Sequence, residues 1–239
     1  MKLANQCAIV TGSTKGIGFA IADALHREGV QLAVSSRNRE EISQTVEKLA
    51  EGGGAKVVGL PCDVQNREEV ESLINFAAAE LEGVDILINN AGIGVFQTVE
   101  KMSPVDWKRV ISTNLDSLFF GCHFVIPEMK KRGGGFIVNI GSLAGKNAFV
   151  TGAAYNASKF GLIGFSEALM QELRYDDIRV AYVMPGSVDT WFGNGPPQGG
   201  DSWKVASVDV AQVVVETLKR DPRCLTSRIE IRPSKPPRK

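Results

Sequence analysis

The chain has 239 residues, with 27 Lys and Arg against 27 Asp and Glu, so its formal net charge is zero. This balance argues against a nucleic-acid partner, because such proteins usually carry a basic surplus or a basic stripe. With 44% hydrophobic residues, the chain can bury a sizeable core, and we expect one α/β domain over residues 1–239. No apolar run reaches the ~18 residues of a membrane helix, and the opening MKLANQ lacks the apolar segment of a signal peptide.

Cysteine and histidine usage argues against two further classes of protein. The four Cys are far apart and show no CxxC spacing, and Cys7 and Cys62 lie in strand-like runs. We therefore expect buried core cysteines rather than disulfides, and a cytoplasmic location. His26 and His123 have no second ligand at metal spacing, so no metal site is expected.

Strand-like apolar runs alternate with amphipathic helical runs along the chain. In order, we expect a strand at 7–11, a helix to about 28, a strand at 31–36, a helix at 39–51, a strand at 56–61, a helix at 67–81, a strand at 84–89, a long helical region at 104–131, a strand at 136–140, a helix at 153–174, a strand at 179–183, a helix at 208–219 capped by Ser207, and a seventh strand at 228–231. The alternation predicts a Rossmann-type, doubly wound parallel sheet with helices on both faces. The Gly- and Pro-rich segment 191–206 is interpreted as a short substrate loop, and the basic 233–239 as a loose tail.

A glycine-rich turn, TGSTKGIG at residues 11–18, joins the first strand to the first helix. Glycine allows the backbone to approach a ligand closely, and a helix N-terminus presents free N–H groups to an anion. The spacing is GxxxGxG rather than GxGxxG, and close packing of the helix on the strand without a ligand is the alternative. We expect the turn to hold the phosphates of a dinucleotide through Gly12, Ser13, Lys15, Gly16, Ile17 and Gly18.

The end of the second strand indicates which dinucleotide binds. Proteins that bind NAD usually place an acid about 20 residues past the turn to hold the ribose 2′-hydroxyl, but this chain has Ser36, Arg37 and Asn38 there. Arg37 can bind a 2′-phosphate with two hydrogen bonds, and Lys15 can add a second positive charge. The sequence therefore favours NADP(H), although both cations could instead be solvated surface charges.

Tyr155, Lys159 and Ser142 form the candidate reacting centre. Tyr155 and Lys159 are four residues apart at the start of a predicted helix, so they share one face. A nearby ammonium lowers the pKa of a phenol toward the neutral range where a general acid works best. Ser142 follows the fifth strand, at the edge where open α/β sheets bind ligands, and its hydroxyl can donate to a carbonyl oxygen. A surface Tyr–Lys pair and a serine that shapes a loop are the alternatives.

Taken together, these motifs resemble the short-chain dehydrogenase/reductase family in its single-domain form, over residues 5–232. The family motifs occur in order: TGxxxGxG at 11–18, an acid after the third strand at Asp63, NNAG at 89–92, a helix asparagine at Asn114, the serine at Ser142, YxxxK at Tyr155 and Lys159, and PG at 185–186 followed by Thr190. Any one of them is a modest signal, whereas the whole set in order is specific.

The resemblance implies a seven-stranded sheet in the order 3-2-1-4-5-6-7 and an NADP(H)-dependent reductase of carbonyl groups. Tyr155 would protonate the carbonyl oxygen and Ser142 would hold it. Lys159 would bind the nicotinamide ribose and lower the pKa of Tyr155, and Asn114 would hold a water in a proton relay. The further cofactor contacts implied are Asp63, Val64, Asn90, Ala91, Gly92, Tyr155, Lys159, Pro185, Gly186, Val188 and Thr190.

The expected substrate pocket is mostly apolar, with no cation placed to bind a carboxylate. Its predicted border consists of Gly94, Phe96, Ala144, Phe149, Trp191 and Phe192. An uncharged ketone, aldehyde or acyl chain is therefore expected, as in reductases of 3-oxoacyl thioesters or general carbonyl reductases. The short segment 191–203 and the ending EIRP depart from many 3-oxoacyl-carrier-protein reductases.

Two other functions remain open. A non-catalytic NADP-binding sensor or scaffold could use the same fold. Nucleotide-sugar epimerases and dehydratases share YxxxK, but only about 50 residues follow Pro185, too few for their substrate domain. Relatives associate through the helices at 104–131 and 153–174, so we expect a homo-oligomer, with a homotetramer favoured over a dimer. Its partner is expected to be a small carbonyl or alcohol substrate, with neither nucleic acid nor membrane.

Overall fold

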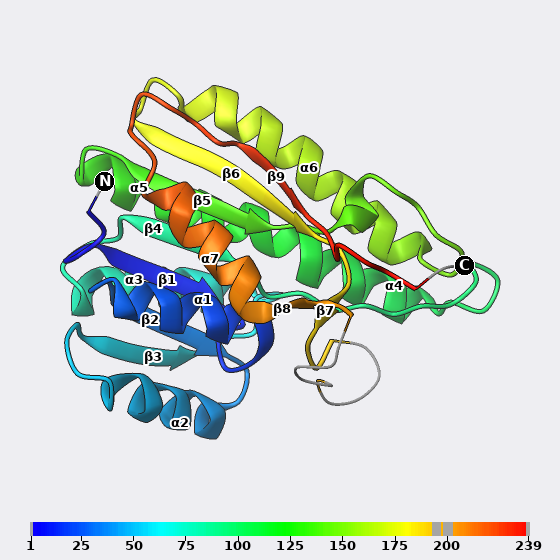
Figure 1. Cartoon of the computed structure of the whole chain (residues 1–239), viewed down its shortest axis with the longest axis horizontal. Helices are drawn as coiled ribbons and strands as arrows, with labels where there is room; N and C mark the ends of the chain where they lie inside the picture. Colours follow the sequence, from blue (N-terminus) through cyan, green and yellow to red (C-terminus); the bar gives the residue numbers. More distant parts are fainter. Residues whose placement is uncertain (1, 193–196, 198–202, 238–239) are drawn as a thin grey trace.

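The structure is a computed structural model that describes residues 2–192, 197 and 203–237. Seven parallel strands form its sheet in the order β3-β2-β1-β4-β5-β6-β9, with helices on both faces (Figure 1). The strands are β1 (Cys7–Thr11), β2 (Gln31–Ser36), β3 (Val57–Pro61), β4 (Ile86–Asn89), β5 (Gly135–Ile140), β6 (Ile178–Pro185) and β9 (Arg228–Ile231). The predicted Rossmann-type fold and its strand order are thus confirmed.

Alternation along β1 shows why both faces of the sheet need cover. Successive side chains of a strand point to opposite faces, and Ala8 and Val10 enter one core whereas Cys7 and Ile9 enter the other. The first core is closed by α1 (Gly16–Arg27), α2 (Arg39–Ala50) and α7 (Ser207–Leu218), and the second by α3 (Arg67–Glu80), α5 (Ser117–Lys131) and α6 (Ala153–Leu173). The inner strands β1 and β4 are therefore buried along their whole length and read as continuous apolar runs, whereas the edge strands β3 and β9 are only partly buried.

Short polar side chains begin three of the helices. Asn38 caps α2, Asn66 caps α3 and Ser103 caps α4 (Pro104–Ile111), each accepting hydrogen bonds from N–H groups of the first turn. These bonds satisfy backbone donors that have no partner within the helix.

The expected cap at Ser207 is wrong, because α7 itself begins at Ser207. The flanking residue is Ala206, whose N–H donates to Asp209 Oδ2 at 3.0 Å. The Asp209 carboxylate in the first turn thus accepts a hydrogen bond from the residue before the helix. This start of α7 is stabilised by that carboxylate and not by a Ser207 hydroxyl.

The predicted helical region 104–131 is interrupted by a π-helical turn at Ser112–Asp116. This turn separates α4 from α5 and contains Asn114, a candidate site residue. One-turn π segments inside α-helices are frequently found at functional sites, so the interruption itself directs attention to Asn114.

Two short strands lie beyond the sheet, within the segment expected to form a substrate loop and just before it. β7 (Val188–Asp189) pairs in parallel with β8 (Val205–Ala206), so the end of the expected loop 191–206 is a strand. Residues 193–196 and 198–202 of that loop lie outside the described residues. The expected loose tail begins with a contact, because a Cβ on Gly186 would lie 3.1 Å from Pro233 Cδ.

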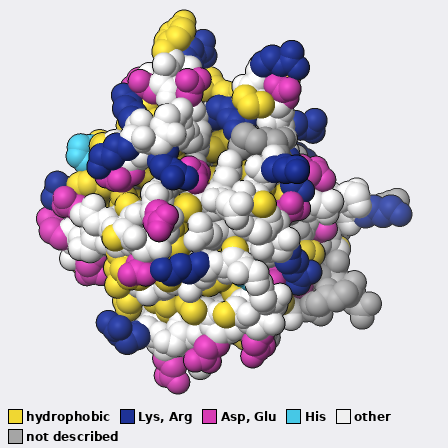
Figure 2. Space-filling view, turned by 90° about the vertical axis from the view of Figure 1, so that its left-hand side faces the viewer, with side chains coloured by type: hydrophobic (Ala, Val, Ile, Leu, Met, Phe, Trp, Pro, Cys, Tyr) yellow, Lys and Arg dark blue, Asp and Glu magenta, His cyan; other side chains and the backbone are white. Residues whose placement is uncertain are grey.

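The face at the amino ends of the strands carries interspersed cationic and anionic side chains (Figure 2). Neither sign gathers there into a single patch, in keeping with the balanced charge of the chain. Within the described ranges, no helix combines the length and the apolar character that a membrane span requires.

Candidate active site

The glycine turn between β1 and α1 is shaped by contacts that admit no side chain. Gly12 and Gly16 have φ of 62° and 59°, a left-handed region that favours glycine. A Cβ on Gly18 would lie 2.2 Å from the carbonyl oxygen of Gly12 and 2.4 Å from Asn90 Nδ2. Helix α1 can therefore approach the turn only because Gly18 lacks a side chain.

The N-terminus of α1 differs from those of α2, α3 and α4. Its flanking residue, Lys15, makes no side-chain cap, and the first turn contains no acid. By contrast, α2, α3 and α4 each have a polar cap and an acid in their first turn. The first N–H groups of α1 thus lack a side-chain acceptor, which is the condition for binding a phosphate.

Thr11 and Asn90 fasten the turn to the end of β4. Thr11 Oγ1 accepts hydrogen bonds from the N–H groups of Asn90 and Ala91 at 3.0 and 3.1 Å. Asn90 Nδ2 donates to the carbonyls of Thr11 and Gly12 at 2.9 and 3.0 Å. Asn90 and Ala91 therefore lie directly behind the turn, as expected of residues near the cofactor, and Asn90 has an evident structural role.

The end of β2 is tied to the same turn. Buried Ser13 exchanges hydrogen bonds with the backbone of Ser35, accepting at 2.8 Å and donating at 3.3 Å. Ser36 Oγ bonds to both the N–H and the carbonyl of Asn38, which in turn caps α2. Arg37 between them is exposed, in a loop that Ser36 and Asn38 shape next to the glycine turn.

An acid that the sequence reasoning missed lies beside Lys15. Glu41, on α2, accepts a hydrogen bond from Thr14 Oγ1 at 2.9 Å, and its other oxygen is 3.9 Å from Lys15 Nζ. No acid occupies the end of β2, but this carboxylate reaches the same region from the adjoining helix. Only the fold could reveal it, because Glu41 matches no motif.

Asp63 and Val64 follow β3 at the same edge of the sheet. Val64 is buried in the second core. The Asp63 carboxylate accepts from the N–H of Gln65 at 3.1 Å and from its side-chain amide at 3.3 Å, so it stabilises the turn that enters α3. Asp63 is half-buried, at a place where a nucleobase amine could reach it.

The Tyr155 phenol, the Ser142 hydroxyl and the Lys159 ammonium come together at the carboxyl edge of the sheet. Ser142 follows β5 and lies close enough to Tyr155 to affect the pKa of its phenol, while its Oγ accepts from the N–H of Ala144 at 3.1 Å. Lys159 Nζ lies 5.8 Å from the centre of the Tyr155 ring. All three expected reacting groups are therefore neighbours in the folded chain.

Burial controls the protonation of both titrating groups. It raises the pKa of Tyr155, the opposite of the net direction expected from the neighbouring ammonium, and the interaction with Ser142 partly offsets the rise. Lys159 is only 5% exposed and donates to the Ile140 carbonyl at 2.9 Å, so burial lowers its own pKa to about 8. The phenol thus remains protonated at neutral pH, in the form that can act as an acid.

Asn114 lies next to these groups, and its amide is engaged by the protein. Its Oδ1 accepts from the N–H of Ile93 at 2.8 Å, and its Nδ2 donates to the Ile93 carbonyl and to Ser158 Oγ. A Cβ on Gly92 would lie 3.4 Å from Asn114 Oδ1 and 3.8 Å from Lys159 Nζ. Gly92 therefore leaves open the space between the π-turn and the lysine.

The segment after β6 faces the glycine turn from the other side. Gly186 N donates to the carbonyl of Ile231 at 2.8 Å, which follows the pairing of Pro185 with Ile231. A Cβ on Gly16 would lie 3.5 Å from Thr190 Cβ. Thr190 thus lies against the glycine turn at Gly16, while Val188 in β7 just before it packs against the first core.

Asn156, which the sequence reasoning missed, holds the loop that follows Ser142. Its buried Nδ2 donates to the carbonyls of Ala144 and Asn147 at 2.6 and 3.3 Å, and its Oδ1 accepts from the N–H of Phe149. Asn156 is adjacent to Tyr155 in α6, so one residue ties the Ser142 loop to the helix that carries the phenol.

The last strand also reaches this loop. Glu230 Oε1 accepts from Lys146 Nζ at 2.8 Å, and Glu230 Oε2 accepts from Arg232 at 2.7 Å; the two cations lower the pKa of Glu230 to about 2. A Cβ on Gly186 would lie 3.2 Å from Leu143 Cδ1 as well as close to Pro233. The C-terminal segment therefore supports the loop on which Ser142 stands.

Aromatic rings border Tyr155. Phe96 and Phe192 have ring centres 5.6 and 5.7 Å from that of Tyr155, and Phe149 lies 5.6 Å from Phe96. The predicted pocket border thus has three of its aromatic members at the phenol. Ala144 lies in the short helical turn after Ser142.

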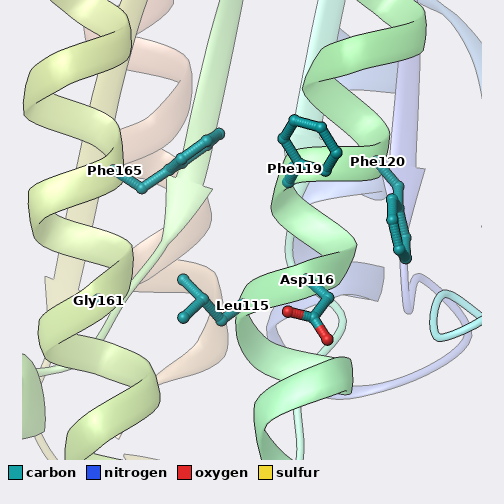
Figure 3. A pocket seen from close by; sticks show the side chains of 6 residues that line it. All are labelled: Leu115, Asp116, Phe119, Phe120, Gly161 and Phe165. Carbon is teal, nitrogen blue, oxygen red and sulfur yellow. The ribbon is translucent and has the colours of Figure 1, made fainter.

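A second apolar surface lies away from the phenol, in a groove between α5 and α6 (Figure 3). Phe165 on α6 points across the groove toward α5, and Leu115 points toward Gly161, where a Cβ would lie 2.8 Å from the leucine side chain. Phe119 on α5 is 53% exposed. The lining is completed by Asp116 and Phe120.

Known proteins share this architecture. The family model for short chain dehydrogenases matches residues 6–195. The chain is 38% identical over 193 residues to dehydrogenase/reductase SDR family member 4 of Mus musculus, covering 80% of this chain and 69% of that one. It is 37% identical over 188 residues to a 3-oxoacyl-[acyl-carrier-protein] reductase of Chlamydia muridarum, covering 79% and 76%.

The fold comparison agrees with the sequence comparison. An alcohol dehydrogenase from the archaeon Thermococcus sibiricus, solved as a complex with 5-hydroxy-NADP, superposes with a TM-score of 0.91 at 26% identity, covering 98% of this chain and 99% of that one. The uncapped helix, the glycine cradle and the lysine beside it fit a nicotinamide dinucleotide. The chain therefore belongs to the short-chain dehydrogenase/reductase family, oxidoreductases that act on CH–OH and C=O groups with such a cofactor.

Proposed function

We propose that this protein is an NADPH-dependent reductase that converts a ketone or aldehyde into the corresponding alcohol. The observation that carries the proposal is the convergence of the buried, protonated Tyr155 phenol with Ser142 and buried Lys159 next to the glycine turn. Relatives named as a 3-oxoacyl reductase and as an alcohol dehydrogenase support this reaction class.

Each reacting group has one task in this proposal. When bound, NADPH supplies a hydride to the carbonyl carbon, so the ketone is reduced and NADPH becomes NADP⁺. Tyr155 gives its proton to the carbonyl oxygen as negative charge develops there, and the Ser142 hydroxyl donates a hydrogen bond to the same oxygen. Lys159 would bind the nicotinamide ribose and place a positive charge next to Tyr155. Both N–H groups of the Asn114 amide are engaged, which leaves the second lone pair of its Oδ1 and the backbone of the π-turn to hold a relay water.

The preference for NADPH over NADH is assigned to Arg37 and Lys15. Both are exposed cations, Lys15 in the glycine turn and Arg37 after β2, and a guanidinium can bind a 2′-phosphate with two hydrogen bonds. The measurement is the ratio of kcat/KM for NADPH to that for NADH. We expect Arg37→Asp to lower this ratio by at least tenfold, because the variant loses a charge-assisted bond and gains a repulsion. An unchanged ratio would show that Arg37 does not face the cofactor.

The reaction itself is tested by following NADPH absorbance with a panel of ketones and aldehydes. Tyr155→Phe should remove most turnover, by at least a hundredfold, while fluorescence titration shows nearly unchanged affinity for NADPH. Activity of the variant comparable to wild type would refute the role of the phenol as an acid. NADPH binding with no turnover of any carbonyl by the unmodified protein would favour the non-catalytic sensor instead.

We also propose that a second copy of this chain covers the groove between α5 and α6. The exposed rings of Phe119 and Phe160, at 53% and 47%, support an interface between copies, since such rings are stabilised by burial. Light scattering of the wild type and of Phe119→Asp tests this, the expected result being a dimer or tetramer that dissociates in the variant. A wild-type monomer at micromolar concentration would overturn it.

A further inference from the structure

The inference concerns three aromatic side chains at the phenol and rests on the proposed reductase function. Phe96 comes from the segment after β4, Phe149 from the segment before α6, and Phe192 from the segment after β6. These segments are far apart in sequence, yet their rings are neighbours. The ring centres of Phe96 and Phe192 lie 5.6 and 5.7 Å from that of Tyr155, and that of Phe149 lies 5.6 Å from Phe96. We call Phe96, Phe149 and Phe192 the aromatic cup.

The rings of the cup are incompletely covered by the protein. Phe96, Phe149 and Phe192 are 42%, 46% and 46% exposed, whereas the large apolar residues of both cores are nearly all buried. Leaving aromatic surface in water is unfavourable, and a contiguous apolar patch of this kind is typical of a ligand site. The exposed ring surface lies at the reacting group and is therefore available to a substrate.

Specific contacts hold the cup in shape. A Cβ on Gly94 would lie 2.6 Å from Phe96 Cζ and 3.0 Å from Phe192 Cζ, so the two rings meet above a residue that must lack a side chain. Phe149 is held through its N–H by Asn156, and Phe192 N donates to Thr190 Oγ1 at 3.2 Å. The rings are thus placed by backbone hydrogen bonds and by a glycine gap.

The charges around the cup argue against an anionic substrate. Phe96, Phe149 and Phe192 offer no charge, and Lys146, the cation in the segment between Ser142 and Phe149, is paired with Glu230 at 2.8 Å. A substrate with a carboxylate or phosphate would lose its hydration here without gaining an opposite charge. The cup instead offers ring faces and edges, which pair favourably with another aromatic ring in stacked or edge-to-face contact.

We propose that the aromatic cup binds the ring of an aryl ketone or aryl aldehyde, whose carbonyl group then reaches Tyr155 and Ser142. The chemistry is that of the proposed function: hydride adds to the benzylic carbon, the phenol proton goes to the oxygen, and the product is a benzylic alcohol and NADP⁺. A linear 3-oxoacyl thioester has no ring to place in the cup and is the poorer substrate.

The test compares acetophenone with cyclohexyl methyl ketone, which has a similar size but no π-system, and with the N-acetylcysteamine thioester of 3-oxobutanoate. The wild type should prefer acetophenone over both by about tenfold in kcat/KM. Phe96→Leu and Phe149→Leu should each lower kcat/KM for acetophenone by about three- to tenfold, the range expected for one aromatic pair, and change that for the cyclohexyl ketone little. Phe124→Leu is the matched control, since Phe124 lies on α5 against Arg67 of α3 and is not part of the cup.

Two outcomes overturn the inference: equal or better reduction of the cyclohexyl ketone or the thioester, and equal losses for both ketones in the leucine variants. The first alone leaves the proposed reductase intact, because some carbonyl is still reduced. If no carbonyl is reduced, the proposed function fails, and the cup is then judged by calorimetric titration of acetophenone into the protein saturated with NADP⁺. Binding that weakens in Phe96→Leu but not in Phe124→Leu supports the cup, and absence of binding refutes it.

Discussion

Replacing Lys159 with methionine should make the protein more stable and inactive at once. Burial lowers the pKa of Lys159 from 10.5 to about 8, which corresponds to about 3 kcal/mol of unfavourable free energy for the charged form, at about 1.4 kcal/mol per pKa unit. Methionine carries no charge, so it removes this unfavourable free energy, and it fills a similar volume. It also leaves the Ile140 carbonyl without the donor seen at 2.9 Å, a loss of about 1 kcal/mol. The net expectation is a gain of about 2 kcal/mol in the free energy of unfolding at pH 7.

The pH dependence separates this explanation from a general packing effect. Below pH 8 the lysine is charged in both states and the full penalty applies to the folded protein. Between pH 8 and 10.5 the folded protein has lost the proton while the unfolded chain still binds it, so the free energy of unfolding of the wild type rises with pH. The advantage of Lys159→Met over the wild type should therefore shrink across this window and become a deficit of about 1 kcal/mol above it, where only the lost hydrogen bond remains.

The assay is urea unfolding of both proteins at pH 7, 9 and 10.5, with NADPH turnover measured in parallel. Lys101→Met serves as control, because Lys101 is exposed and its replacement should change stability little at any pH. A variant less stable than the wild type at pH 7, or a difference independent of pH, would refute the reasoning. Loss of turnover with increased stability would show that the buried charge is retained for function.

Further predictions concern the cofactor cleft. Glu41→Gln removes the carboxylate 3.9 Å from Lys15. Fluorescence titration should show NADPH binding about two- to fivefold tighter, as expected for one exposed ion pair, and NADH binding unchanged. Weaker binding of NADPH would mean that Glu41 supports the site through Thr14. Gly18→Ala would place a Cβ 2.2 Å from the Gly12 carbonyl and should destabilise the protein by about 1 to 3 kcal/mol and weaken nucleotide binding at least tenfold. The matched Gly164→Ala, whose Cβ would meet nothing within 4 Å, should gain about 0.5 to 1 kcal/mol in thermal unfolding; equal behaviour of the two would contradict the close contact.

The sequence predicts the sheet well because its inner strands are buried on both faces. Continuous apolar runs such as Cys7–Thr11 and Gly135–Ile140 have no alternative but the interior, so strand positions and their alternation with helices follow from composition alone. The order of the strands and the convergence of Ser142, Tyr155 and Lys159 required the family resemblance, since local patterns carry no information on which strands pair.

Other features depend on tertiary contacts that local patterns do not encode. Glu41 reaches the cofactor cleft from a helix whose own pattern is that of an ordinary polar face. Asn156 lies inside the YxxxK motif, but its hydrogen bonds to the Ser142 loop are visible only once the loop is folded. The direction of the pKa shift at Tyr155 was misjudged for a similar reason: proximity to Lys159 follows from helical spacing, whereas the extent of burial does not.

The Glu230–Lys146 contact has a practical consequence for preparing the protein. The segment around Pro233 ends beside the loop that bears Ser142, while the opposite terminus emerges at the far end of the strands (Figure 1). A purification tag joined after this segment would act on the contacts of Glu230 and Pro233 that support the Ser142 loop. A tag placed ahead of Leu3 would lie at the opposite end of the strands, away from this loop (Figure 1).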